Sequence, residues 1–498
     1  MQIKSKYRYA ILLLVLLFQG CASTAVHQRL EEFQRPDEYV RFFEILDRMV
    51  DEADVRNAAS FPVAGFPYLR TNRFLTGLKA ELHTGPRKEQ WIRMLQQLDF
   101  KARKKEIQNL SPAAVVDLAG ELDVAPDRRI LQERMADYSD KLMTHDQRRS
   151  DYLTTVQAAV TNFDEYRTAY RVLGIYPITA LPVAVVTHRV QDKFEKWHHT
   201  PVEQLNILGD VVGYGPTQSV SYSQATAGMI LNRSRDNALG IPIPSPADAR
   251  ILVDMFAPLI HQDQVNSYDS IGAVIWKEGH VRIDSRQPTV YYYFTYARFK
   301  AEPILQLNYA FWYSAREGPN SPWIERGELD GLTVRISLDS DGLPFMVDIM
   351  NTCGCYHFYV PDRKRVKRII PTPQEVDVFV PRWMPESFPQ KRLYLRMNSG
   401  WHQVVNMGTE TRPSGWRPYR LEPYEQLEML PRSENTYESM FNSRGIAKDS
   451  ERIEFLVFFP MGIPDVGSMR QRGHHAIKMV GRSYFEDPDL FDNNFEFY

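Results

Sequence analysis

The apolar residues of this chain change their spacing along the sequence. Before residue 213 they recur at helical intervals, as in the stretch from Tyr39 to Met49, and this period predicts helices. After residue 248 apolar and polar residues alternate, as from Leu332 to Leu338, and this alternation predicts strands. We therefore predict an α+β chain, with an N-terminal all-α domain over 38–212, a linker over 213–248 and an antiparallel, jelly-roll-like β-sandwich over 249–498.

The first twenty residues have the features of an export signal. Three basic residues between positions 4 and 8 precede an apolar run from Ala10 to Phe18, and a small residue, Gly20, follows. The run is too short to span a bilayer comfortably, which favours a removable signal peptide over a membrane anchor. We predict that residues 1–20 form this peptide.

The end of that segment resembles the lipobox of bacterial lipoproteins. Gly20 is the small residue that precedes the modified cysteine, whereas Phe18 and Gln19 depart from the residues usual there. The resemblance implies that Cys21 receives diacylglycerol and starts a lipidated tether over 21–37, so that membrane lipid is a partner. Because no Asp follows Cys21, the resemblance further implies anchoring to the outer membrane, facing the periplasm.

The charge balance excludes one class of partner. Lys and Arg number 60 and Asp and Glu number 62, for a formal charge of −2, so no overall positive field would attract nucleic acid. The sequence also has no P-loop, no glycine-rich dinucleotide fingerprint, no HExxH helix and no GxSxG elbow, which disfavours the enzyme classes that carry these motifs.

The pattern of residues 328–357 predicts one β-hairpin around the turn sequence Asp339 to Gly342. In an unbroken strand Glu328 and Asp330 share the face of the apolar residues that follow them, and buried carboxylates need a compensating partner. On the returning strand the same parity predicts that three more side chains meet them: Cys353, Cys355 and His357. Glu328 and Asp330 are therefore our candidate catalytic residues, as general base or metal ligand. Further strands are predicted over 376–380, 392–397 and 453–459.

Three interpretations of the Cys353–His357 segment remain open. Cys353 and Cys355 could form a disulfide, helped by a bend at Gly354. Alternatively, Cys353, Cys355, His357 and His261 could bind zinc or another divalent metal, because zinc accepts thiolate, imidazole and carboxylate donors. In the third interpretation the cysteines are free and buried, and the histidine is satisfied by hydrogen bonds.

The region 305–357 resembles the jelly-roll core of the necrosis-inducing NLP cytolysins and of the vacuolar sorting protein 62 family. The aromatic run from Tyr309 to Tyr313 and the segment from Ile324 to Asp330 carry the resemblance. It implies a jelly-roll strand that supplies metal ligands in the cytolysins. The motif matches and differs at successive positions: Glu325 and Gly327 replace two histidines, Arg326 matches an arginine, Glu328 stands for Asp, Leu329 for Trp and Asp330 for Glu.

The sequence supports three hypotheses of function. The first is a lipid-anchored envelope protein whose β-sandwich binds an envelope glycan, a lipid or a protein partner in the periplasm. The second is a metal-dependent hydrolase that acts on envelope glycan or lipid through the Glu, Asp, Cys and His residues above. The third is an assembly lipoprotein, for which broad exposed apolar surface is expected.

Overall fold

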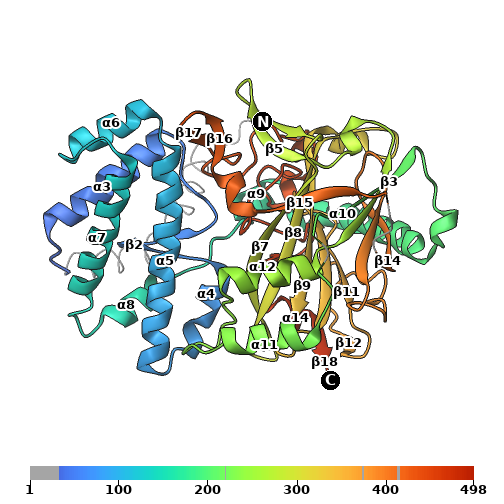
Figure 1. The fold of residues 1–498 in the computed structure, drawn as a ribbon, viewed down its shortest axis with the longest axis horizontal. Helices are drawn as coiled ribbons and strands as arrows, with labels where there is room; N and C mark the ends of the chain where they lie inside the picture. Colours follow the sequence, from blue (N-terminus) through green and yellow to red (C-terminus); the bar gives the residue numbers. More distant parts are fainter. Residues whose placement is uncertain (1–32, 219, 373–374, 412–414) are drawn as a thin grey trace, which may run out of the picture. The chain divides into compact units, whose positions relative to one another are not determined.

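The computed structural model describes residues 33–218, 220–372, 375–411 and 415–498 (Figure 1). The predicted signal peptide and Cys21 lie outside these residues. The chain forms two compact units, one up to Phe163 and one from Asp164, with Asn57–Ala59 belonging to the second. The boundary therefore precedes the predicted linker over 213–248, and two helices that we expected in the N-terminal domain belong to the second unit: α9 (Thr168–Leu173) and α10 (Tyr176–His199).

The described part of the N-terminal unit is mainly helical, as predicted. Its helices are α3 (Asp37–Glu52), α4 (Arg73–Gly77), η1 (Leu78–Glu81), α5 (Gly85–Asn109), α6 (Pro112–Glu121), α7 (Arg128–Asp146) and α8 (Tyr152–Ala159). A short hairpin of β1 (Phe61–Val63) and β2 (Phe66–Thr71) interrupts them. Arg70 of β2 is fully buried and pairs with Asp99 and Glu106 of α5, which ties the hairpin to the longest helix of this unit.

The second unit is built on a ten-stranded, mostly antiparallel sheet. Its strands follow the order β11-β10-β9-β8-β7-β15-β3-β4-β13-β14. Their bounds are β3 (Asp210–Pro216), β4 (Leu259–Gln264), β7 (Thr289–Phe299), β8 (Glu302–Arg316), β9 (Gly327–Leu338), β10 (Pro344–Asn351), β11 (Phe358–Pro361), β13 (Arg392–Met397), β14 (Val404–Glu410) and β15 (Arg417–Pro423).

This sheet is continuous, so the predicted two-sheet sandwich is not confirmed. Strand β15 joins the two halves of the sheet, β11-β10-β9-β8-β7 and β3-β4-β13-β14. Its first residues pair with β3 and the following ones with β7, both in parallel. The sheet is curled, because one apolar core contains residues from both halves, such as Ile260 and Leu395 of one and Tyr309 and Val347 of the other. Helices α11 (Gln224–Ser234) and α12 (Pro246–Phe256) contribute to the same core.

C-terminal segments cover part of the opposite face of the sheet. A second cluster packs Phe345 and Tyr359 against Phe491 and Phe495. The remaining elements are η2 (Val202–Gln204), η3 (Ser267–Asp269), β5 (Ala273–Lys277), β6 (His280–Asp284), η4 (Trp323–Glu325), β12 (Val366–Ile369), η5 (Tyr424–Glu428), β16 (Leu430–Ser433), β17 (Thr436–Glu438), α13 (Phe455–Phe458), η6 (Phe459–Met461), α14 (Leu490–Asn494) and β18 (Phe495–Phe497). Among the described residues, no helix combines the length and apolar character needed to cross a membrane.

The predicted hairpin is present as β9 and β10. Asp339 Oδ1 accepts hydrogen bonds from the backbone N–H groups of Asp341 and Leu343, both at 2.9 Å, and this closes the turn. Pairing extends to Asn351 opposite Leu332. The strand predicted over 392–397 is β13, whereas those predicted over 376–380 and 453–459 are wrong. The segment 376–380 makes isolated backbone hydrogen bonds, such as the one that Phe379 accepts from the Tyr359 N–H at 2.9 Å, and 453–459 forms the helical turns α13 and η6.

Candidate functional site

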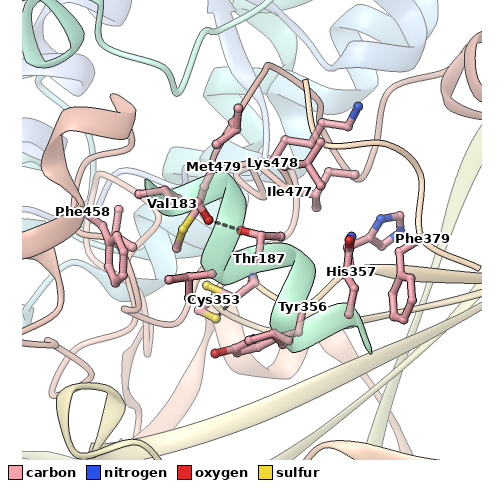
Figure 2. A pocket seen from close by; sticks show the side chains of 18 of the residues that line it. Val183, Thr187, Cys353, Tyr356, His357, Phe379, Phe458, Ile477, Lys478 and Met479 are labelled. Carbon is pink, nitrogen blue, oxygen red and sulfur yellow. Dashed lines mark hydrogen bonds between the residues drawn. The ribbon is translucent and has the colours of Figure 1, made fainter. Parts of the chain in front are cut away.

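A cavity of about 360 Å³ lies beside helix α10 in the second unit. Its wall is formed mainly by α10 from Val183 to Phe194, the loop 353–359, the segment 376–379 and C-terminal residues between 454 and 480. Figure 2 shows Val183 and Thr187 on the helix, with Cys353 and Tyr356 close by, Phe458 toward one end and His357 and Phe379 toward the other.

Apolar side chains dominate this wall. They come from all the segments that meet there and include Val183, Val190, Phe194, Val378, Phe458 and Val480. Val186 also lines the cavity, yet 53% of it is exposed, so α10 places apolar surface both inside the cavity and at its rim. Exposed apolar residues continue along α10 and α13, with Leu181 at 68% and Leu456 at 70%. An apolar molecule could therefore enter from this side.

The two cysteines lie together in the wall as free thiols. The backbone N–H of Cys355 points at Sγ of Cys353, 3.3 Å away. The bend between them requires a glycine, because Gly354 has a φ of +88° and an added Cβ would lie 2.5 Å from the carbonyl oxygen of Ala476. A hydrogen bond with the Cys353 thiol and burial raise the pKa of Cys355 well above its ordinary value, so this thiol is protonated at neutral pH.

His357 also lines the cavity, but one ring nitrogen is already engaged. Its Nε2 lies 2.9 Å from Oδ2 of Asp348, whose carboxylate accepts hydrogen bonds from Arg335 at 2.9 and 2.6 Å. Burial lowers the pKa of His357 and the hydrogen bond to Asp348 only partly opposes this shift, which leaves the imidazole neutral. The structure thus brings Cys353, Cys355 and His357 to one cavity, as predicted.

The two predicted catalytic carboxylates do not join them. Leu329 between them has a φ of +57°, which breaks the alternation assumed for this strand. Glu328 is exposed and pairs with Arg282 at 2.7 Å. Asp330 is fully buried and is bound by Arg316 and His402. The predicted convergence of five side chains on one face is therefore wrong.

Asp330 belongs to a buried polar network that reaches the cavity at Glu325. Arg316 donates to Asp330 at 2.8 and 3.0 Å and to Glu325 at 2.7 Å. Glu325 accepts two further hydrogen bonds, from Trp401 Nε1 at 2.9 Å and from the Tyr356 hydroxyl. Although burial favours the neutral acid, Arg316 and His402 hold the pKa of Asp330 far below its ordinary value. This satisfied carboxylate stabilises the fold and is not among the residues that line the cavity.

Glu454 is a cavity residue that sequence reasoning missed. It is 4% exposed, lines the cavity and has no hydrogen-bond or ion-pair partner in the described part of the chain. Burial, and then the nearby Glu325 carboxylate, raise its pKa from 4.5 to about 7. The β-like pattern of 453–459 concealed it, because a strand would not single out this position.

His261 lies in a different place. Its Nε2 pairs with Glu410, and its ring centre lies 4.8 Å from those of both Tyr394 and Trp416. It is not among the residues that line the cavity. Across the described ranges, no group of three or more His, Cys, Asp or Glu side chains is placed to hold a metal ion. The predicted set of Cys353, Cys355, His357 and His261 is thus not assembled.

Comparison with known proteins gives no relative. No family model matches the chain, and neither the curated proteins nor the solved structures provide a match. The resemblances to lipoproteins and to the cytolysin core therefore stay predictions from sequence, and function must be argued from the cavity itself.

Proposed function

We propose that this protein is a lipid-anchored bacterial envelope protein whose second unit binds an apolar ligand in the cavity beside α10. The observation that carries this proposal is the cavity of about 360 Å³ with its mainly apolar wall. Small-molecule sites are concave, mostly apolar and roughly 300–1,000 Å³ in volume, with a few polar groups that orient the ligand. The cavity meets each of these conditions.

The surroundings of the cavity support an apolar ligand rather than a polar one. Val186 belongs to both the wall and the exposed surface, and Leu456 and Val457 of α13 are exposed next to the lining residue Phe458. Contiguous apolar surface gives a water-insoluble molecule a favourable path into the cavity, because each Å² of apolar area removed from water contributes about 25 cal/mol. The lipid anchor and outer-membrane location come from the sequence of residues 1–21.

The other two hypotheses have weaker support. A hydrolase would need Glu328 or Asp330 as base or ligand, but Glu328 is exposed outside the cavity and pairs with Arg282. Both carboxylate oxygens of Asp330 are engaged by Arg316 and His402. An assembly lipoprotein would account for the exposed apolar residues of α9 and α10, such as Leu173 and Leu181. It would not account for a cavity with Glu454 in its wall.

The test measures binding of Nile red, a neutral apolar dye that fluoresces when removed from water. The protein is the full mature chain with Cys21→Ser, which prevents acylation. Val183→Trp fills the cavity from α10, and Val185→Trp places the same ring on the same helix but outside the lining, where Val185 is 51% exposed. We expect Val183→Trp to weaken dye binding at least about tenfold, since one lost apolar contact group changes affinity by 1–3 kcal/mol.

Two results would contradict the proposal. One is the absence of saturable dye binding to the parent protein. The other is equal binding by Val183→Trp and Val185→Trp when both variants keep the circular dichroism spectrum and melting temperature of the parent.

A further inference from the structure

The polar part of the cavity wall is acidic. Three of the lining residues are carboxylic acids, Glu325, Asp377 and Glu454, whereas one lining residue, Lys478, is a full cation. Lys478 Nζ lies 2.9 Å from Oε2 of Glu375, so its charge is already balanced. Glu325 is balanced in the same way by Arg316, so Asp377 and Glu454 are the lining carboxylic acids without an ion pair in the described part of the chain. An anionic head group, such as that of a fatty acid, would meet net negative charge in this wall.

The three carboxylic acids differ in how they are satisfied. Glu325 accepts from Arg316, Trp401 and Tyr356. Asp377 Oδ1 accepts from the backbone N–H and the hydroxyl of Thr372, at 2.9 and 3.1 Å. Glu454 is buried to the same degree as many core residues, yet it has no hydrogen-bond or ion-pair partner among the described residues. Its carboxyl group therefore keeps free acceptor positions that a bound ligand could use.

The cations nearest to Glu454 are committed elsewhere. Arg316 holds Asp330 and Glu325. Arg452 donates to the backbone carbonyl groups of Glu328, Leu329 and Ser450, and Gly327 packs against its guanidinium. Neither guanidinium can turn to Glu454 without abandoning buried acceptors. Neither of these two cations pairs with Glu454, which leaves its carboxylate available to a cation in the cavity.

We propose that Glu454 binds a protonated amine at the head of the apolar ligand, so that the cavity selects cationic amphiphiles over fatty acids and neutral alcohols. This inference rests on the proposed function, because it assigns the head group of the ligand whose apolar part occupies the same cavity. The carboxylate supplies a charge-assisted hydrogen bond in a site with little water, which is the environment where such a bond is strongest.

The experiment compares three displacers of Nile red that share one alkyl chain: dodecylamine, dodecanol and laurate. At about pH 8 the amine is protonated and laurate is ionised. We expect dodecylamine to displace the dye at a concentration at least about tenfold lower than dodecanol, because only the amine donates a charge-assisted hydrogen bond to Glu454. Laurate should be the weakest displacer, since its carboxylate is repelled by the acidic wall. Glu454→Gln should remove the preference for the amine and leave displacement by dodecanol within about twofold.

Glu328→Gln is the matched control, because it makes the same change at an exposed carboxylate outside the cavity. Equal displacement by amine and alcohol in the parent protein, or an amine preference that survives Glu454→Gln, overturns the inference and leaves the proposed function standing. An equal loss of preference in both Gln variants overturns it as well, since general surface charge would then be the cause. If none of the three alkyl compounds displaces the dye, both the inference and the proposed function fail.

Discussion

Nδ1 of His402 lies 2.8 Å from Oδ2 of Asp330, and the opposite nitrogen of the same ring lies 3.1 Å from Oδ1 of Asp269. All three side chains are fully buried. Burial alone would lower the pKa of His402, but the hydrogen bonds to the two carboxylates outweigh it and raise the pKa above 6.5. Below this raised pKa, a buried imidazolium between two aspartates, extended by Arg316, holds together η3, β9 and the loop that follows β13.

Replacing this histidine should destabilise the second unit strongly. His402→Asn leaves two buried carboxylates without their shared cation, and breaking a buried ion pair costs about 3–5 kcal/mol. His280→Asn is the matched control, because His280 pairs with Asp449 at 2.9 Å at the surface, where such a pair contributes at most about 1 kcal/mol. Urea unfolding followed by circular dichroism measures both. Similar losses for the two variants would refute the assigned role.

The same histidine should make stability depend on pH. Because its pKa is raised on folding, the stabilisation is complete below pH 6.5 and is lost as the pH rises through the higher pKa of the folded state. The difference in free energy of unfolding between the parent and His402→Asn should therefore shrink above pH 6.5. A difference that grows with pH would show that the imidazole is neutral in the fold.

Replacing the carboxylates at 328 and 330 by the corresponding amides should change stability by very different amounts. Asp330→Asn breaks its buried contacts with Arg316 and His402 and should cost about 3–5 kcal/mol. Glu328→Gln removes an exposed pair with Arg282 and should change stability by no more than about 0.5 kcal/mol. Melting temperatures of the two variants decide this. A large loss of stability in Glu328→Gln would mean that this side chain is buried on the core face, as the sequence alternation predicted.

Ionisation of Glu454 should lower the free energy of unfolding as the pH rises from about 4.5 to about 7. Its pKa is raised from 4.5 to about 7 by burial and by Glu325, so the folded state binds its proton more tightly than the unfolded chain does. Above pH 7 the folded state carries the full cost of the buried charge, on the order of 3 kcal/mol, since one pKa unit equals about 1.36 kcal/mol. Glu454→Gln should remove this pH dependence. A gap between parent and variant that stays constant from pH 4.5 to 8 would contradict the assignment.

Local alternation was enough to predict the hairpin, because the alternate residues from Leu332 to Leu338 pack with Val347 and Ile349 on one core and the Asp339 turn fixes their register. Phe345, which has the same parity as Val347, packs in the cluster on the opposite face, since the pairing is irregular between Pro344 and Met346. The alternation failed at Leu329, just before Leu332, because a left-handed φ at this residue rotates Glu328 to the surface. That conformation depends on tertiary contacts: Leu329 packs with Cys353, and Arg452 binds its carbonyl group. The sequence pattern around position 329 shows neither contact.

The site itself was predictable only in part. Cys353, Cys355 and His357 were grouped correctly because they are close in sequence, and a short loop keeps them together. Glu454 and α10 join them from positions far along the chain, and no spacing rule links such positions. The domain boundary was misplaced for a related reason: α10 has a helical period like the N-terminal unit, but it packs on η6 and β14.

The cysteine pair should react slowly with alkylating agents until the protein unfolds. With Cys21→Ser, the cysteines that remain are Cys353 and Cys355. Because the thiolate is the reactive form and a raised pKa depletes it, iodoacetamide at about pH 8 should modify Cys355 at least about tenfold more slowly than an exposed cysteine. Saturating dodecylamine should slow the reaction further, since Cys355 lines the cavity. Mass spectrometry counts the modified thiols, and both should be modified when urea unfolds the protein.

If neither thiol is modified after unfolding in the absence of reductant, the two cysteines form the disulfide that was one of the three interpretations of the sequence. The free-thiol pair described above is then wrong.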